Sequence, residues 1–235
     1  EKRPVFVYLH GGGFTGGSGQ VPVYAGEGLA KKGPVTITIN YRLGVLGFLA
    51  HPELSKESGH NASGNYGLMD QVAALAWVRK NIAAFGGDPS RVTVAGQSAG
   101  GMSVHALIGS PLATGLFQRA IVESGGSRIG GGMTMGGRGL ADAEAAGVKF
   151  AESKGAKSLA ELRAMTWQKI TEPVPAPAST RGPAGGGMRF SPIVDGYFSP
   201  LSNREAVQQG KFNDVPILTG VNLGELAGMT PQPPP

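Results

Sequence analysis

The chain has 235 residues, of which 40% are hydrophobic and 16% are charged, a balance that suits one folded α/β domain with a sizeable core. The formal net charge is +5, but the cations are scattered along the sequence, so we do not expect nucleic acid as a partner. No run of 18 apolar residues occurs, so no membrane-spanning segment is expected. The absence of cysteine excludes disulfides and thiolate metal sites.

Residues 5–9 form a continuous β-prone run, of the kind that is buried on both faces in a parallel sheet. A glycine-rich loop follows, from His10 to Gly19. Its three successive glycines, Gly11 to Gly13, allow the backbone to turn its N–H groups toward one point, which is what an oxyanion requires. A phosphate-binding loop and a plain flexible loop are the alternatives. Because the loop lacks the Gly-Lys-Ser/Thr ending of a phosphate loop, we favour an oxyanion hole.

The next segment is predicted to contain a helix, a strand and a loop. We expect a short helix over residues 24–32, ended by a Gly-Pro pair, and a β-branched strand over residues 35–40. Residues 41–49 are punctuated by glycine and are predicted to form a loop. Arg42 is expected to make a buried or half-buried ion pair that fixes this loop.

His51 and His60 flank a polar stretch, and we expect both to be solvent-exposed loop residues. The longest helix is predicted over residues 65–85, and we interpret its Met69 and Trp77 as packing residues. Apolar side chains recur there every three to four positions, so that one stripe faces the sheet: Leu68, Val72, Leu75, Val78 and Ile82.

Residues 91–101 form a short apolar run that ends in a Gly-x-Ser-x-Gly motif centred on Ser98. A serine displayed for attack sits on a turn so sharp that the residues two positions away cannot carry bulky side chains, and Gly96 and Gly100 meet this demand. The helix that follows points free N–H groups at the site. We therefore interpret Ser98 as a nucleophile rather than as an idle serine in a turn. His105 lies on the helix that leads away from this turn, so we interpret it as a packing residue.

Beyond the nucleophile motif, a further strand is predicted over residues 120–124 and a last one over residues 215–221. Between them, residues 125–190 are rich in glycine, methionine and proline, with two modest helices near residues 141–153 and 158–164. We expect this part to be an excursion over the carboxyl edge of the sheet that shapes the ligand pocket.

Five sequence blocks resemble the signature motifs of the type-B carboxylesterases, the family that includes the cholinesterases. In chain order they are His10-Gly11-Gly12-Gly13-Phe14, Asn40-Tyr41-Arg42-Leu43-Gly44, Gly64-Asn65-Tyr66-Gly67-Leu68-Met69-Asp70-Gln71, Phe85-Gly86-Gly87-Asp88-Pro89 and Gly96-Gln97-Ser98-Ala99-Gly100. The resemblance implies an α/β-hydrolase fold, with a mostly parallel central sheet and helices on both faces. It implies a serine esterase that acts on a small-molecule carboxylic ester without a metal or other cofactor, and it favours a secreted or periplasmic location.

The resemblance also implies the site residues. Ser98 matches the nucleophile of the family, and the backbone N–H groups of Gly12, Gly13 and Ala99 match its oxyanion hole. The implied reaction is acyl transfer in two steps, through an acyl-enzyme that water then hydrolyses.

Residues 220–225 resemble the segment that holds the acid of the family, which implies Glu225 as the third member of the triad. The usual sequence there is Asp-Glu-Gly, whereas Gly224 and Leu226 flank the glutamate in this chain. We interpret Asp195 as a turn carboxylate, and the acid role would pass to it if Glu225 were dispensable.

In this fold the catalytic histidine follows the acid in the chain. Here all four histidines precede Glu225: His10, His51, His60 and His105. We therefore interpret residues 1–235 as a single, partial α/β-hydrolase domain, truncated at both ends, from a longer esterase, with Pro-rich residues 231–235 as a frayed or foreign end. Two alternatives remain, a non-catalytic adhesion or binding module on the same fold and an inactive truncated product.

Overall fold

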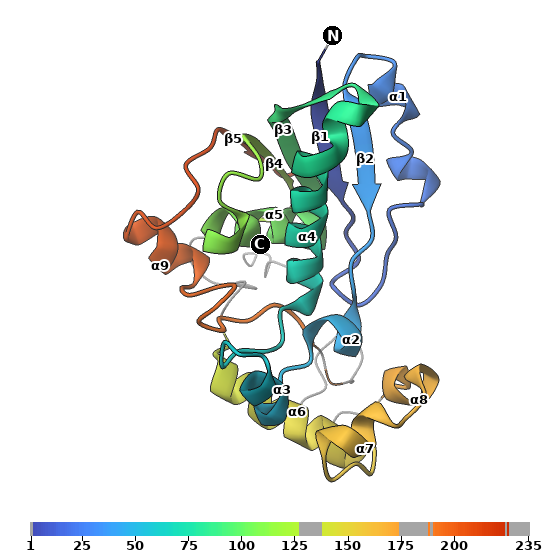
Figure 1. The fold of residues 1–235 in the computed structure, drawn as a ribbon, viewed down its shortest axis with the longest axis vertical. Helices are drawn as coiled ribbons and strands as arrows, with labels where there is room; N and C mark the ends of the chain where they lie inside the picture. Colours follow the sequence, from blue (N-terminus) through green and yellow to red (C-terminus); the bar gives the residue numbers. More distant parts are fainter. Residues whose placement is uncertain (1, 127–137, 174–187, 189, 224, 226–235) are drawn as a thin grey trace, which may run out of the picture.

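The computed structural model describes residues 2–126, 138–173, 188, 190–223 and 225. Its centre is a five-stranded parallel sheet in the order β2-β1-β3-β4-β5 (Figure 1). All the predicted strands are present, and the third begins earlier than expected. Their bounds are β1 (Arg3–Leu9), β2 (Val35–Ile39), β3 (Gly87–Gln97), β4 (Arg119–Glu123) and β5 (Ile217–Gly220).

The parallel register brings the carboxyl ends of the strands to one edge of the sheet. Leu9 near the end of β1 lies beside Gly96 of β3, Gly96 lies beside Val122 of β4, and Val122 lies beside Thr219 of β5. Loops that follow neighbouring strands therefore emerge side by side, which is where ligands bind in open α/β sheets.

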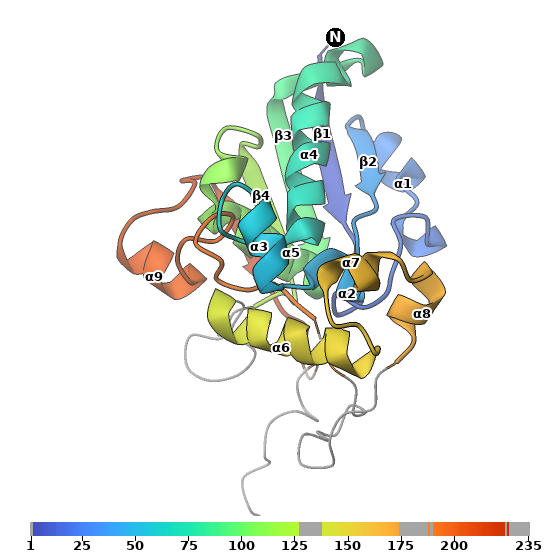
Figure 2. The ribbon, with the colours of Figure 1, turned by 60° about the horizontal axis from the view of Figure 1, so that its bottom comes forward.

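Helices surround this sheet (Figures 1 and 2). The longest is α4, which begins at Tyr66, one residue after its predicted start, and continues into a 3-10 turn, η2, that ends at Phe85 as predicted. The helices are α1 (Glu27–Ala30), α2 (Gly44–Phe48), α3 (Pro52–Glu57), α4 (Tyr66–Asn81), α5 (Ala99–Gly109), α6 (Leu140–Ser153), α7 (Leu159–Arg163), α8 (Trp167–Thr171) and α9 (Asn203–Gln208), with 3-10 turns η1 (Pro22–Tyr24), η2 (Ile82–Phe85) and η3 (Pro111–Ala113). None of the helices in the described part of the chain has both the length and the apolar character needed to cross a bilayer.

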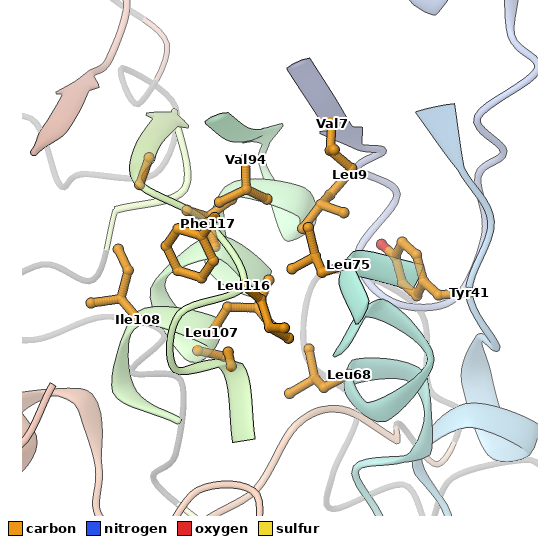
Figure 3. Packing of buried hydrophobic residues seen from close by; sticks show 14 of the residues in the cluster. Val7, Leu9, Tyr41, Leu68, Leu75, Val94, Leu107, Ile108, Leu116 and Phe117 are labelled. Carbon is orange, nitrogen blue, oxygen red and sulfur yellow. The ribbon is translucent and has the colours of Figure 1, made fainter. Parts of the chain in front are cut away.

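The main core lies between one face of the sheet and the helices α4 and α5 (Figure 3). Val7 and Leu9 of β1 and Val94 of β3 point into it and have no exposed surface. From α4, the predicted stripe supplies Leu68 and Leu75, which are equally buried. Such side chains each contribute about 1.5–3 kcal/mol by burial, so this layer dominates the stability of the sheet.

The expectation that the first strand is buried on both faces is wrong for the described residues. Phe6 and Tyr8, which alternate with the buried residues of β1, are only partly buried. Trp77, interpreted as a packing residue, is 50% exposed and packs against Phe85 at the surface. Met69 is partly buried and packs against the main core, as expected.

Three local predictions need correction. The helix expected over residues 24–32 is shortened to α1, preceded by η1, because Gly26 and Gly28 weaken a helix in this segment. The loop expected over residues 41–49 contains a short helix, α2. His51 is buried, at 6% exposure, because its ring caps α3 by accepting a hydrogen bond from the Glu53 N–H. His60 is exposed, as predicted.

The predicted excursion over residues 125–190 contains α6 and α7 close to their expected places, and α8 in addition. Figure 2 shows α6 crossing the molecule beyond the carboxyl ends of the strands. The returning chain is fixed to the start of α4 by two hydrogen bonds between the buried Asn65 amide and the backbone of Ile193, of 2.9 and 3.0 Å. The parts of the excursion at residues 127–137 and 174–187, and the Pro-rich end at residues 231–235, lie outside the described residues.

Candidate active site

Ser98 occupies the turn between β3 and α5, with φ 55° and ψ −119°. A positive φ is unusual for a residue with a side chain and costs on the order of 1–3 kcal/mol, so the surrounding structure must hold it. Such a strained strand-to-helix turn presents the serine hydroxyl above the end of the sheet. The backbone of Ser98 is held by a 2.9 Å hydrogen bond from its N–H to the Glu123 carbonyl of β4.

Two glycines make this turn possible. A Cβ atom added to Gly96 would lie 2.9 Å from the Cα of Gly100, and one added to Gly100 would lie 2.8 Å from the carbonyl carbon of Leu9. Real Cβ atoms essentially never come this close to other heavy atoms. The two glycines of the motif are therefore required by the close passage of β1, β3 and α5, as the sequence predicts.

The glycine loop after β1 lies against the same turn. A Cβ atom on Gly11 would lie 3.3 Å from Ser98 Cβ and 2.8 Å from the Gln97 carbonyl oxygen. Gly12 and Gly13 have φ values of 117° and 63°, which favour glycine. Among the described residues, no hydrogen bond uses the N–H groups of these two glycines. The loop and the start of α5 thus bring potential anion-binding N–H groups to the serine.

The glycine loop rests on a buried tyrosine. The Tyr41 hydroxyl donates a 2.7 Å hydrogen bond to the His10 carbonyl, and the two rings stack with centroids 4.4 Å apart. Both residues are buried, and burial raises the pKa of Tyr41 above its usual range, so the phenol stays protonated and remains a donor. The contacts of Tyr41 with His10 therefore fix the direction in which the loop leaves β1.

A second buried polar pair supports α5. The Gln71 amide on α4 donates a 3.0 Å hydrogen bond to the Ser103 hydroxyl, which itself donates to the Ala99 carbonyl at 3.0 Å. Gln71 and Ser103 have no exposed surface. Because a buried polar group is costly unless it is paired, these contacts specify one position for the first turn of α5, immediately after Ser98.

Glu225 lies beside the carboxyl end of β4. Its Oε2 atom accepts hydrogen bonds from the Ser124 hydroxyl at 2.6 Å and from the Asn222 N–H at 3.1 Å. These two bonds, the Ser124 hydroxyl first, lower the pKa of Glu225 below its ordinary value, because they stabilise the charged form. Ser124 follows β4 directly and has a positive φ of 46°, which turns its side chain toward the acid.

None of the four histidines donates to or accepts from the Ser98 hydroxyl in the described part of the chain. His10 is buried, with its Nδ1 2.8 Å from the Gly11 carbonyl. His51 caps α3, and His60 stacks on Tyr197 with ring centroids 3.8 Å apart. His105 is a partly buried residue of α5, as predicted, and burial lowers its pKa.

Two carboxylates have structural partners. Asp195 is a turn carboxylate, as interpreted from the sequence, because its Oδ1 accepts from the Tyr197 and Ser199 N–H groups at 3.0 and 2.8 Å. Arg42 forms the expected ion pair, a two-pronged contact with Asp70 of α4 with hydrogen bonds of 2.9 and 2.8 Å, but its side chain is 53% exposed and so less buried than expected. Across the described residues, no three His, Asp or Glu side chains gather closely enough to hold a metal ion.

A profile of the Carboxylesterase family matches residues 1–233. The chain belongs to the carboxylesterase family. The resemblance seen in the sequence blocks is thereby confirmed, and so is the α/β-hydrolase fold, since carboxylesterases are its structural neighbours.

Three proteins similar to the chain differ in name and source. The chain is 42% identical over 240 residues to the fumonisin B1 esterase of Sphingopyxis macrogoltabida, covering 98% of the chain and 41% of that protein. It is 38% identical over 225 residues to human neuroligin-2, covering 95% of the chain and 25% of that protein. The crystal structure of a Geobacillus stearothermophilus carboxylesterase superposes with a TM-score of 0.78 at 39% identity, covering 94% of the chain and 45% of that structure. The chain therefore spans less than half the length of these relatives.

Three supporting residues were missed by sequence reasoning. Ser124 ends the strand next to the nucleophile strand, and its position at the carboxyl edge is the signal that could have identified it. Tyr41 and Gln71 lie inside the family blocks, but nothing in their spacing predicts that they support the glycine loop and α5. Those contacts join segments that are distant in sequence.

Proposed function

We propose that the protein to which this chain belongs is a carboxylic ester hydrolase that uses Ser98 as its nucleophile. The observation that carries the proposal is the strained backbone of Ser98, placed against the glycine loop of Gly11 to Gly13. A strain of this kind persists where it serves a function, since a relaxed turn would be more stable. Membership of the carboxylesterase family supports ester hydrolysis as the reaction.

In the first step, Ser98 Oγ attacks the ester carbonyl carbon, and the serine proton passes to a histidine. The carbonyl oxygen becomes an oxyanion, which the N–H groups of Gly12, Gly13 and Ala99 stabilise. Donors of this type contribute about 2.7–4 kcal/mol each to the transition state. The C–O bond to the alcohol then breaks as the histidine returns the proton to the leaving oxygen. Water repeats the sequence on the acyl-enzyme and releases the acid.

The histidine base would come from polypeptide outside these 235 residues, because the four histidines of the chain have other positions. Glu225 would be the acid that orients it. Its Oε2 atom is engaged by Ser124 and Asn222, and Oε1 accepts no hydrogen bond from the described residues. A carboxylate held in this way is ionised and can accept a hydrogen bond from an imidazole N–H. This bond fixes the histidine in the tautomer that a general base needs.

A non-catalytic binding module is the second candidate. This candidate is supported by the similarity of the chain to human neuroligin-2, which is not named as an esterase. The two candidates differ in what they require of Ser98. An esterase needs its hydroxyl, whereas a binding module is indifferent to it.

The experiment compares the 235-residue chain with the full-length product of its gene. Hydrolysis of nitrophenyl esters from acetate to octanoate and labelling by a fluorophosphonate probe would be measured for both, with Ser98→Ala as the matched variant. We expect turnover and labelling in the full-length protein, and loss of both in Ser98→Ala without a change in melting temperature. A folded full-length protein that hydrolyses none of these esters would refute the proposed function.

The isolated chain should be a very poor esterase. Loss of the base of a serine hydrolase costs about 10⁶ in turnover, and an oxyanion hole alone leaves on the order of 10³ to 10⁴ over water. For the acid, Glu225→Gln in the full-length protein should reduce turnover far more than Asp195→Asn. Equal turnover of the short and full-length forms would show that a histidine of this chain is the base after all.

A further inference from the structure

The amino edge of the sheet carries an open cleft of about 600 Å³ lined by basic side chains. We call it the basic cleft, and its cations are Lys2, Arg3, Lys31, Lys32 and Arg91, all of them exposed. The remaining described lining residues are Pro4, Ala30 and Gly33, none of which carries a carboxylate. Five of the 21 cations of the chain thus share one concavity, although in the sequence they lie in three separate segments.

The strand register explains why these segments meet. Arg3 begins β1 and lies beside Gly87 of β3, while Val5 lies between Val35 of β2 and Val92 of β3. Arg91 therefore reaches the same edge as Arg3, and the Lys31-Lys32 pair before β2 reaches it from the other side. Figure 1 shows the N-terminus and α1 together at the top, at the opposite end of the strands from the turn after β3. The basic cleft is separate from the candidate active site.

The charges of the basic cleft are only partly offset by the described residues. None of the five cations forms an ion pair with a described carboxylate. The hydrogen bonds that Asp88 Oδ1 accepts from the Ser90 hydroxyl at 2.6 Å and the Ser90 N–H at 2.9 Å, and then the charges of Lys2 and Arg91, lower the pKa of Asp88. Its carboxylate therefore stays charged and offsets part of the charge of Lys2 and Arg91. Arg3 and Arg91 lie on β1 and β3, which are neighbouring strands about 4.8 Å apart, so these two charges lie within about one Debye length of each other. Like charges held this close attract a multiply charged anion strongly.

We propose that the basic cleft binds a ligand that carries a multiply charged phosphate group. The planar guanidinium groups of Arg3 and Arg91 can each bind two phosphate oxygens at once. The lysine ammonium groups, on flexible side chains, add positive charge around them. The phosphate could belong to a soluble condensed phosphate or to the headgroup of an acidic phospholipid. The chemistry of the contact is the same in both, and the experiment separates them.

Two probes test the site on the full-length protein that contains this chain. Inorganic tripolyphosphate would be titrated by calorimetry, and vesicles of phosphatidylcholine with phosphatidic acid would be compared with pure phosphatidylcholine vesicles by co-sedimentation. We expect saturable binding to at least one probe at about 0.1 M salt, weakening as salt is raised. Binding of tripolyphosphate identifies a soluble source, and binding to acidic vesicles alone identifies a headgroup.

The matched variants have the same change in net charge. Lys31→Glu, Lys32→Glu and Arg91→Glu together should weaken binding at least tenfold. The control combines Lys149→Glu, Lys157→Glu and Arg204→Glu, three exposed cations outside the basic cleft, and should stay within about twofold of the unmodified chain. Circular dichroism melts check folding, and the milder glutamine versions of the first set replace it if it unfolds. Absence of binding to both probes, or equal weakening in the two sets, would overturn the proposal.

Discussion

The Ser124 hydroxyl donates a 2.6 Å hydrogen bond to Glu225 Oε2 and joins residues 101 positions apart in the chain. The serine is fixed by its own N–H, which donates to the Gly220 carbonyl of β5 at 2.8 Å. The acid is thus positioned by the ends of two neighbouring strands. The same bond lowers the pKa of Glu225, so the carboxylate stays ionised to a lower pH than an unbound glutamate.

Removal of this hydroxyl should raise the pKa of Glu225 toward its ordinary value. A lowered folded-state pKa contributes stability above the unfolded pKa, and that stability is lost as the pH falls through the folded value. Ser124→Ala should therefore shift the carboxyl titration of Glu225 upward when it is followed by NMR. The control is Ser153→Ala, whose hydroxyl donates to the Phe150 carbonyl and not to a carboxylate. An unchanged titration of Glu225 in Ser124→Ala would show that the bond does not form in solution.

A side chain at Gly96 should disrupt the turn that carries Ser98. Gly96→Ala forces a Cβ atom to within 2.9 Å of the Gly100 Cα, so we expect the free energy of unfolding to fall by about 1–3 kcal/mol. Urea unfolding of the chain measures this change. Gly28→Ala is the matched control, because its Cβ meets nothing within 4 Å and alanine favours the helix α1. Equal loss in the two variants would contradict the crowding argument.

The nucleophile turn and the glycine loop were predictable because both are set by local sequence. The glycines that allow the close passage at Ser98 stand next to it in the chain, and the strands of the sheet are continuous β-prone runs. The long helix α4 was predictable for the same reason, since its apolar stripe repeats with the helical period.

What the sequence missed depends on contacts between distant segments. The polar neighbours of His51 predict an exposed residue, but His51 is buried. The Ser63 hydroxyl donates a hydrogen bond to the His51 carbonyl, and the His51 ring caps α3 by accepting from the Glu53 N–H. The cations look scattered in the sequence, but the pairing of β1 with β3, together with the segment before β2, brings five of them into the basic cleft. No periodicity or motif encodes either outcome.

Removal of the Tyr41 hydroxyl should loosen the glycine loop. Its 2.7 Å bond to the His10 carbonyl is buried, and a buried acceptor left without its donor costs about 1–3 kcal/mol. Tyr41→Phe should lower the free energy of unfolding by this amount. The control is Tyr197→Phe, since the Tyr197 ring stacks on His60 and its hydroxyl makes no hydrogen bond to the described residues. A Tyr41→Phe variant as stable as the unmodified chain would mean that the contact contributes little.

His105 should make the chain less stable at mildly acidic pH. Burial in α5 lowers its pKa below the ordinary value of about 6.5, because the charged form loses its hydration. Between these two values the unfolded chain binds the proton and the folded chain does not, so the free energy of unfolding falls as the pH falls from about 7 toward the folded pKa. His105→Gln should reduce this pH dependence, measured by urea unfolding at pH 7.5 and 5.5, whereas His60→Gln at an exposed position should leave it nearly unchanged. If the two variants have the same pH dependence as the unmodified chain, another group titrates in this range and the buried imidazole is not the cause.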